Sequence, residues 1–155
     1  MTQDASFSDG QEKPLNIAAL DDEDLKVLSA LVQDAVFPIT EMQWDAKARR
    51  FGLLVNRFRW ELPSSAATRP ERVQSVLAFE NVQKIASQGI DRADKDLVLS
   101  ILSVDFVSTD ETGGDLTVQL AGDGAIKLTV EALECRLKDV TRPYVAPSGA
   151  APKHD

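Results

Sequence analysis

Arg57 and Arg59, two residues apart, are the side chains of this sequence best suited to bind an anion. They lie in residues 51–61, where the order of apolar and polar residues predicts a long strand. Because side chains alternate between the two faces of a strand, both arginines share one face, roughly 7 Å apart. Two guanidinium groups at this spacing can hold a phosphate or carboxylate between their planar donors. We therefore predict an anion or partner site on the second half of this strand, which we expect to open onto solvent.

A second interpretation gives the same arginines a structural role. Arg57 and Arg59 would then pair with acidic side chains across strands and keep a sheet edge soluble. Exposure decides between the two interpretations. An anion site requires arginines that face solvent and are not already bound by the protein's own carboxylates.

Further residues would join the anion site if the turn before the strand and the loop after it lie nearby. Trp60 stands beside the arginines, where an aromatic ring could stack a base or anchor a peptide, although Trp60 and Trp44 also fit a core. The predicted site residues are Arg49, Arg57, Arg59, Trp60 and Arg72, and Arg50 and Arg69 would extend the patch.

The charge of the chain is unevenly distributed. Residues 47–72 hold seven of the 17 basic residues and only two acids, so they carry +5 and the remainder −13, in a chain of net charge −8. Such segregation predicts one anion-attracting surface on an acidic body. The acidic balance argues against nucleic acid as a partner, because that would need positive charge along the whole groove or strand.

Nucleophilic and metal chemistry find little support. The only histidine, His154, is the last residue but one, and the single cysteine, Cys135, fits a buried apolar position. No phosphate-binding loop, dinucleotide fingerprint or nucleophile elbow is present. The aspartates at 91, 94 and 96 are interrupted by Arg92 and Lys95, so we interpret them as a solvated turn. We expect no catalytic residue, no metal and no cofactor.

The periodicity of apolar residues predicts one helix, about seven strands and a final helix. Asp21 or Asp22 can cap the first helix, residues 22–35, whose start is acidic. The last ten residues of the pattern, 131–140, place Leu133, Leu137 and Val140 on one helical face. The predicted strands are residues 39–44, 50–62, 72–79, 82–90, 97–107, 115–120 and 125–130, and glycine-containing turns precede the last two.

This order indicates an α+β fold with a strongly bent antiparallel sheet or a small half-open barrel of about seven strands, an N-terminal helix and a C-terminal helix. The order is similar to that of pleckstrin-homology domains, and other half-open antiparallel sheets with helices on one face fit it as well. We expect residues 15–141 to form a single globular domain, with disordered tails at 1–14 and 142–155.

The chain shows no leader-like or membrane-spanning pattern. Its first residues are polar and acidic, and no apolar run approaches the roughly 18–20 residues needed to cross a bilayer. A lone cysteine agrees with a reducing compartment. We expect a cytoplasmic protein.

Five stretches of the chain resemble a family of small proteobacterial proteins of unknown function. They are residues 20–25, 31–36, 49–61, 89–92 and 124–131, and the most specific is Asn56-Arg57-Phe58-Arg59-Trp60-Glu61. The resemblance covers about residues 16–141 and leaves out both ends. It implies a single-domain cytoplasmic protein and no known activity, cofactor or catalytic residue.

These observations favour a non-enzymatic binding or adaptor domain whose basic strand surface meets an acidic protein or a phosphorylated small ligand. One alternative is a small enzyme that binds an anionic metabolite through arginines and transfers a proton through a carboxylate. Another is a structural subunit of a homo-oligomer, and exposed strand edges would allow a homodimer under each interpretation.

Overall fold

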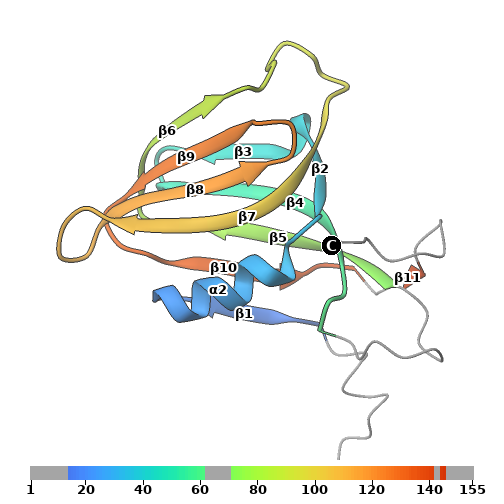
Figure 1. The fold of residues 1–155 in the computed structure, drawn as a ribbon, viewed down its shortest axis with the longest axis horizontal. Coiled ribbons are helices and arrows are strands. Elements are labelled where there is room, and N and C mark those ends of the chain that lie inside the picture. Colours follow the sequence, from blue (N-terminus) through green and yellow to red (C-terminus); the bar gives the residue numbers. More distant parts are fainter. Residues whose placement is uncertain (1–13, 62–70, 142–143, 146–155) are drawn as a thin grey trace, which may run out of the picture.

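The computed structural model describes residues 14–61, 71–141 and 144–145. Within these ranges the chain forms eleven strands, one α-helix and one short 3-10 turn (Figure 1). The elements are β1 (Asn16–Ala19), α2 (Asp22–Leu31), β2 (Val36–Pro38), η1 (Ile39–Glu41), β3 (Met42–Asp45), β4 (Arg50–Phe58), β5 (Glu71–Phe79), β6 (Val82–Gln88), β7 (Val98–Ser108), β8 (Gly114–Leu120), β9 (Ala125–Val130), β10 (Cys135–Asp139) and β11 (Tyr144–Val145).

All strand pairs are antiparallel, and they join into one strongly bent sheet in the order β1-β10-β5-β4-β2-β7-β8-β9-β6. Two strands stand off this path, β11 beside β5 and β3 beside β4. The sheet curls around a core that its inward side chains fill from both halves (Figure 1). Among the largest fully buried apolar side chains are Phe37, Leu53, Leu77, Phe79, Leu116, Leu120, Ile126 and Leu128.

Helix α2 lies between β1 and β7, two strands of the curled sheet that do not pair with each other (Figure 1). The carboxylate of Asp21 accepts a hydrogen bond from the backbone N–H of Asp24, as predicted for a capped start. Leu25 and Leu28 face the core and are buried. The helix ends at Leu31, four residues before the predicted boundary, because Asp34 adopts a left-handed φ of 64° that leads into β2.

No α-helix of the described residues lies between β3 and β6. Within the described ranges β3 pairs only with β4, and β6 pairs only with β9. The start of β6 is fixed beside the β3–β4 turn, since the N–H of Val82 donates to the carbonyl of Arg49 over 2.9 Å. Each of these two strands therefore keeps one edge that no described strand covers.

The prediction of a C-terminal helix is wrong. Residues 135–139 form β10, which pairs with β1 on one side and β5 on the other. Cys135, Leu137 and Asp139 point inward and are buried, whereas Arg136 and Lys138 are exposed. Burial of every second residue is the period of a strand. In the same region, Leu133 and Leu137 have the spacing of a helix, so the sequence fits both kinds of element.

The predicted fold class is also wrong. The described chain has one α-helix and eleven strands, instead of two helices flanking about seven strands, and the pleckstrin-homology analogy depends on the absent final helix. Three unpredicted strands, β1, β2 and β11, span only two to four residues each, too few to display a period in sequence. The strands predicted from longer patterns agree with β3 to β9 to within a few residues.

One further strand lies beyond the C-terminal boundary of the predicted domain. Tyr144 and Val145 pair as β11 with Arg72 and Glu71, so the sheet continues past the expected boundary at residue 141. The rest of the two predicted tails lies outside the described residues, apart from Pro14. In the part of the chain that the structure describes, no helix is long and apolar enough to cross a membrane.

Candidate functional site

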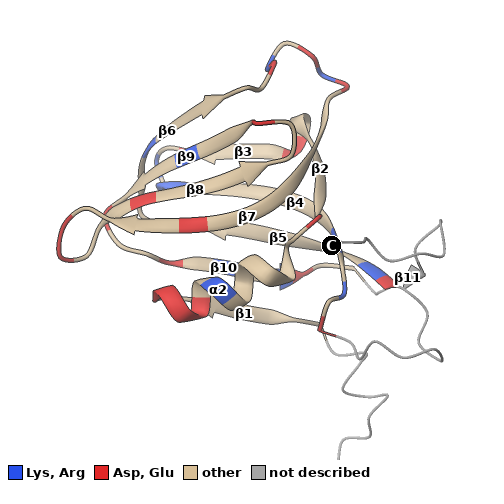
Figure 2. Ribbon diagram, viewed as in Figure 1, with Lys and Arg blue, Asp and Glu red and all other residues tan. Residues whose placement is uncertain are grey.

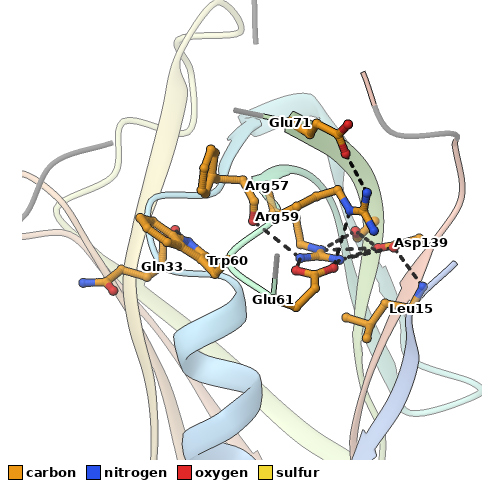
Figure 3. Close-up of polar contacts among 10 residues, drawn as sticks. Leu15, Gln33, Arg57, Arg59, Trp60, Glu61, Glu71 and Asp139 are labelled. Atoms are coloured by element: carbon orange, nitrogen blue, oxygen red, sulfur yellow. Dashed lines mark hydrogen bonds and ion pairs between the residues drawn. The ribbon is translucent and has the colours of Figure 1, made fainter. Parts of the chain in front are cut away.

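Arg57, the centre of the predicted anion site, is fully buried at the end of β4 (Figure 3). Its face of the strand continues the buried residues Leu53 and Val55. Its guanidinium donates to both oxygens of Glu61, over 2.8 and 2.9 Å, and to Asp139 Oδ1 over 3.0 Å. The side chain is thus held by two carboxylates of the protein itself.

Asp139, the deeper of these carboxylates, has a side chain that is only 2% exposed. It accepts hydrogen bonds from Ser75 Oγ over 2.7 Å and from the backbone N–H of Leu15 over 2.9 Å, besides those of Arg57. Its position on β10 links the end of β4 to β5 and to the residue before β1 (Figure 3). Full hydrogen bonding is what a buried carboxylate requires in order to stay charged.

Arg59 is enclosed in the same way. It is 4% exposed and donates to Glu71 Oε1 over 2.6 Å, and its Nε lies 3.6 Å from Glu61 Oε2. Arg57, Arg59, Glu61, Glu71 and Asp139 together form a group that we call the buried ion cluster.

The pKa values within the buried ion cluster follow from these contacts. Burial alone would lower the pKa of Arg57, but the hydrogen bonds and charges of Glu61 and Asp139 outweigh it and raise that pKa. Burial alone would raise the pKa of Glu61, but the hydrogen bond and charge of Arg57 outweigh it and lower that pKa. Both groups therefore stay ionised near neutral pH.

The prediction that this half of the strand opens onto solvent is wrong. Arg57 and Arg59 point into the protein, and native carboxylates occupy them, so the condition set for an anion site is not met. Their role in the structure agrees with the alternative interpretation of ion pairing across strands, although the pairs are buried rather than at a soluble edge.

Of the other predicted site residues, Arg72 and Trp60 lie at the same end of β4 as these arginines, whereas Arg49 does not. Arg49 lies before the start of β4, at the opposite end of that strand, and forms an ion pair of 2.8 Å with Glu131. Arg72 donates to Asn56 Oδ1 over 2.6 Å. The indole N–H of Trp60 donates to the carbonyl of Gln33 over 2.9 Å, and its ring contacts Phe58 edge-on. Arg50 is paired with Glu80, and Arg69 lies outside the described residues.

A pocket of about 530 Å³ lies instead in the opening between β3 and β6, beside the loop that joins β6 to β7. This volume is within the roughly 300–1,000 Å³ typical of small-molecule sites. We call it the β3–β6 pocket. Its lining residues are Ile39, Thr40, Met42, Trp44, Phe51, Gln83, Lys84, Ile85, Ser87, Arg92, Lys95 and Ile126.

The lining combines an apolar floor with a basic rim. Phe51 and Ile126 belong to the buried core, so the floor reaches into the curled sheet. Lys84 on β6 and Arg92 and Lys95 on the following loop are exposed. No aspartate or glutamate is among the lining residues, and within the described chain these three basic side chains form no hydrogen bond or ion pair.

Three aspartates lie in the same loop as Arg92 and Lys95 but do not line the pocket. In the β6–β7 loop, Asp91 accepts the N–H of Ala93 and Asp94 accepts the N–H of Asp96, each over 3.1 Å. These bonds shape two tight turns and confirm the prediction of a solvated turn. Figure 2 shows the resulting alternation of acidic and basic residues along this loop.

One more acid lies one contact away from the pocket. Glu131 accepts a hydrogen bond from the lining residue Gln83 over 3.0 Å, and its charge is paired with Arg49 over 2.8 Å. Among the residues that line the β3–β6 pocket, the charged ones are therefore all basic.

Comparison with known protein families gives one match. Residues 15–154 match the model of a family described as a protein of unknown function, DUF2948. The chain belongs to the DUF2948 family. No curated protein and no solved structure matches the chain. The match confirms the resemblance to a family of proteins of unknown function, and it spans a single domain that includes the buried ion cluster and the β3–β6 pocket.

Sequence reasoning on this DUF2948 chain missed the basic rim of the pocket. Lys84, Arg92 and Lys95 lie outside the basic window of residues 47–72, and in the sequence the last two only interrupt an acidic run. The available signal was weak: two basic residues within a short charged connection, placed between two predicted strands. Trp44, which from its sequence also fits a core, lines the pocket.

Proposed function

We propose that this protein is a binding domain that holds a small anionic ligand in the β3–β6 pocket. The observation that carries the proposal is the combination of a basic rim without carboxylates and an apolar floor in one hollow of suitable size. The anion-attracting surface predicted from the sequence is thereby moved from Arg57 and Arg59 to Lys84, Arg92 and Lys95.

The origin of the rim residues supports this proposal. Lys84 extends from a strand, whereas Arg92 and Lys95 extend from a loop that two side-chain-capped turns hold in shape. An anion between the strand and the loop would be met by cationic groups from both elements. Because these side chains have no partner among the described residues, binding would break no existing ion pair.

We propose binding rather than catalysis for two reasons. The lining of the pocket contains no aspartate, glutamate, histidine or cysteine, so its serine and lysines have no carboxylate or imidazole among the lining residues to activate them. Glu61, an acid beside arginines, has a lowered pKa and is held by Arg57, so it is a poor proton donor near neutral pH. We further propose a cytoplasmic location, which the lone buried cysteine supports.

A fluorescent anion tests the proposal. The probe is 8-anilinonaphthalene-1-sulfonate, which joins an apolar ring system to one negative charge and therefore matches both parts of the pocket. We expect saturable binding by the native protein that weakens as salt is added. The double variant Arg92→Glu, Lys95→Glu should bind at least about tenfold more weakly, since it replaces attraction by repulsion at the rim.

A matched control separates the pocket from the charge of the whole molecule. The double variant Lys26→Glu, Lys138→Glu makes the same change in charge at two exposed positions outside the pocket, on α2 and β10. It should bind the probe like the native protein. Equal weakening in both double variants, or none in either, would contradict the proposal. Size-exclusion chromatography of the same samples reports whether the alternative of a homo-oligomer holds.

A further inference from the structure

The largest side chain that lines the β3–β6 pocket is exposed to solvent. Trp44 on β3 is 43% exposed, although its ring is apolar over most of its surface. It lies directly opposite Phe51 in the β3–β4 register, and Met42 precedes it by two residues on the same face. All three line the pocket.

Exposure of this ring has a structural reason. β3 is an edge strand, so no described strand lies beyond Trp44 to cover it. The neighbouring Phe51 is buried and stacks on Phe79, with ring centroids 6.3 Å apart, so the pocket reaches the aromatic side chains of the core through Phe51. The indole of Trp44 is thus an aromatic side chain of the pocket that is partly exposed to solvent.

An aromatic surface beside cations favours one class of ligand. A flat ring can stack on the exposed part of the indole, and such stacking strengthens binding about three- to tenfold beyond the apolar area alone. A flexible alkyl chain would lose more conformational freedom on binding. Lys84, Arg92 and Lys95 supply the charge that an attached anionic group needs.

We infer that the β3–β6 pocket binds a planar aromatic ring that carries a phosphate or similar anionic group, with the ring against Trp44 and the anion at the basic rim. This inference rests on the proposed function and adds the chemical class of the ligand to it. The polar side chains of Thr40, Gln83 and Ser87 also line the pocket and can hydrogen-bond to heteroatoms of such a ring.

Two probes of equal carbon number test the inference. Phenyl phosphate and hexyl phosphate carry the same anionic group and six carbons each, but only the first has a ring. Their affinities are measured by displacement of bound 8-anilinonaphthalene-1-sulfonate. We expect phenyl phosphate to bind at least about threefold more tightly than hexyl phosphate.

Two variants of Trp44 complete the test. Trp44→Leu keeps an apolar side chain without a ring and should remove the preference for phenyl phosphate. Trp44→Phe keeps a ring and should retain most of it. Circular dichroism checks that both variants fold, which the partial exposure of Trp44 leads us to expect.

The possible outcomes distinguish this inference from the proposed function. If hexyl phosphate binds as tightly as phenyl phosphate, or if Trp44→Leu keeps the preference, the aromatic inference is overturned while anion binding stands. If neither phosphate displaces the probe at millimolar concentration, and the probe binds the variant Arg92→Glu, Lys95→Glu as tightly as the native protein, the aromatic inference and the proposed function are both overturned.

Discussion

Arg57 illustrates how one buried charge can stabilise a curled sheet. Its partner Asp139 is 2% exposed, so removal of the arginine leaves a carboxylate in the interior without its counter-charge. We expect Arg57→Met to lower the free energy of unfolding by about 3–5 kcal/mol. The surface variant Arg50→Met, which breaks the exposed pair with Glu80, should cost no more than about 1 kcal/mol.

Urea denaturation of the two arginine variants gives the comparison. Equal losses in Arg57→Met and Arg50→Met would mean that the buried ion cluster contributes no more than a surface pair. The result would then contradict the stabilising role that we assign to it.

Glu61 should make stability depend on pH. Its pKa is lowered in the folded protein from the ordinary value of 4.5, so its contribution is fully present above pH 4.5 and is lost as the pH falls through the folded value. The thermal midpoint of the native protein should therefore fall more steeply below pH 4.5 than that of Glu61→Gln. Parallel curves for the two proteins would show that Glu61 is not coupled to Arg57.

Cys135 should be inert in the folded state. Burial raises its pKa to about 12, so the thiol is protonated at neutral pH and the reactive thiolate is scarce. We expect slow reaction with 5,5′-dithiobis(2-nitrobenzoic acid) in buffer and rapid reaction in urea. Fast labelling without denaturant would show that β10 opens readily.

At the scale of elements, β7 and β8 approach so closely at Gly114 that this position requires a glycine. A Cβ at Gly114, the first residue of β8, would lie 2.2 Å from the carbonyl oxygen of Val107 and 2.8 Å from the ring of Phe106. Gly114→Ala should therefore destabilise the protein by at least about 1–3 kcal/mol, because the β7–β8 hairpin must spread. Gly52→Ala is the control, since nothing lies within 4 Å of its Cβ, and it should change stability little. Comparable denaturation midpoints for both variants would contradict the tight register of this hairpin.

The elements also show what the sequence could and could not predict. Long alternating patterns and glycine turns predicted β3 to β9. The region of β10 carried two periods at once, and the choice between them depended on β1 and β5, which flank it but lie far away in sequence. Likewise, the two faces of β4 were sorted correctly, but Arg57 could not be placed inside without knowing that Asp139, 82 residues later, would meet it.

At the scale of the whole molecule, one curled sheet separates two kinds of charge. The buried ion cluster holds the far end of β4 to β5 and β10, and its arginines are occupied. The β3–β6 pocket lies beside the other end of β4 and presents basic groups to solvent. Its lining runs from Ile39 to Ile126, so only the closure of the fold assembles it, and sequence alone could not.

The two tryptophans of the chain allow a direct test of which end binds anions. Trp44 lines the β3–β6 pocket, whereas Trp60 lies next to the buried ion cluster with its indole N–H bound to the carbonyl of Gln33. Their indole N–H signals are followed in ¹H–¹⁵N nuclear magnetic resonance spectra during titration with 8-anilinonaphthalene-1-sulfonate, and Trp44→Phe assigns the two. Our account predicts that the Trp44 signal shifts to saturation while the Trp60 signal stays in place. A shift of Trp60 alone would contradict it and return the anion site to the arginine end of β4.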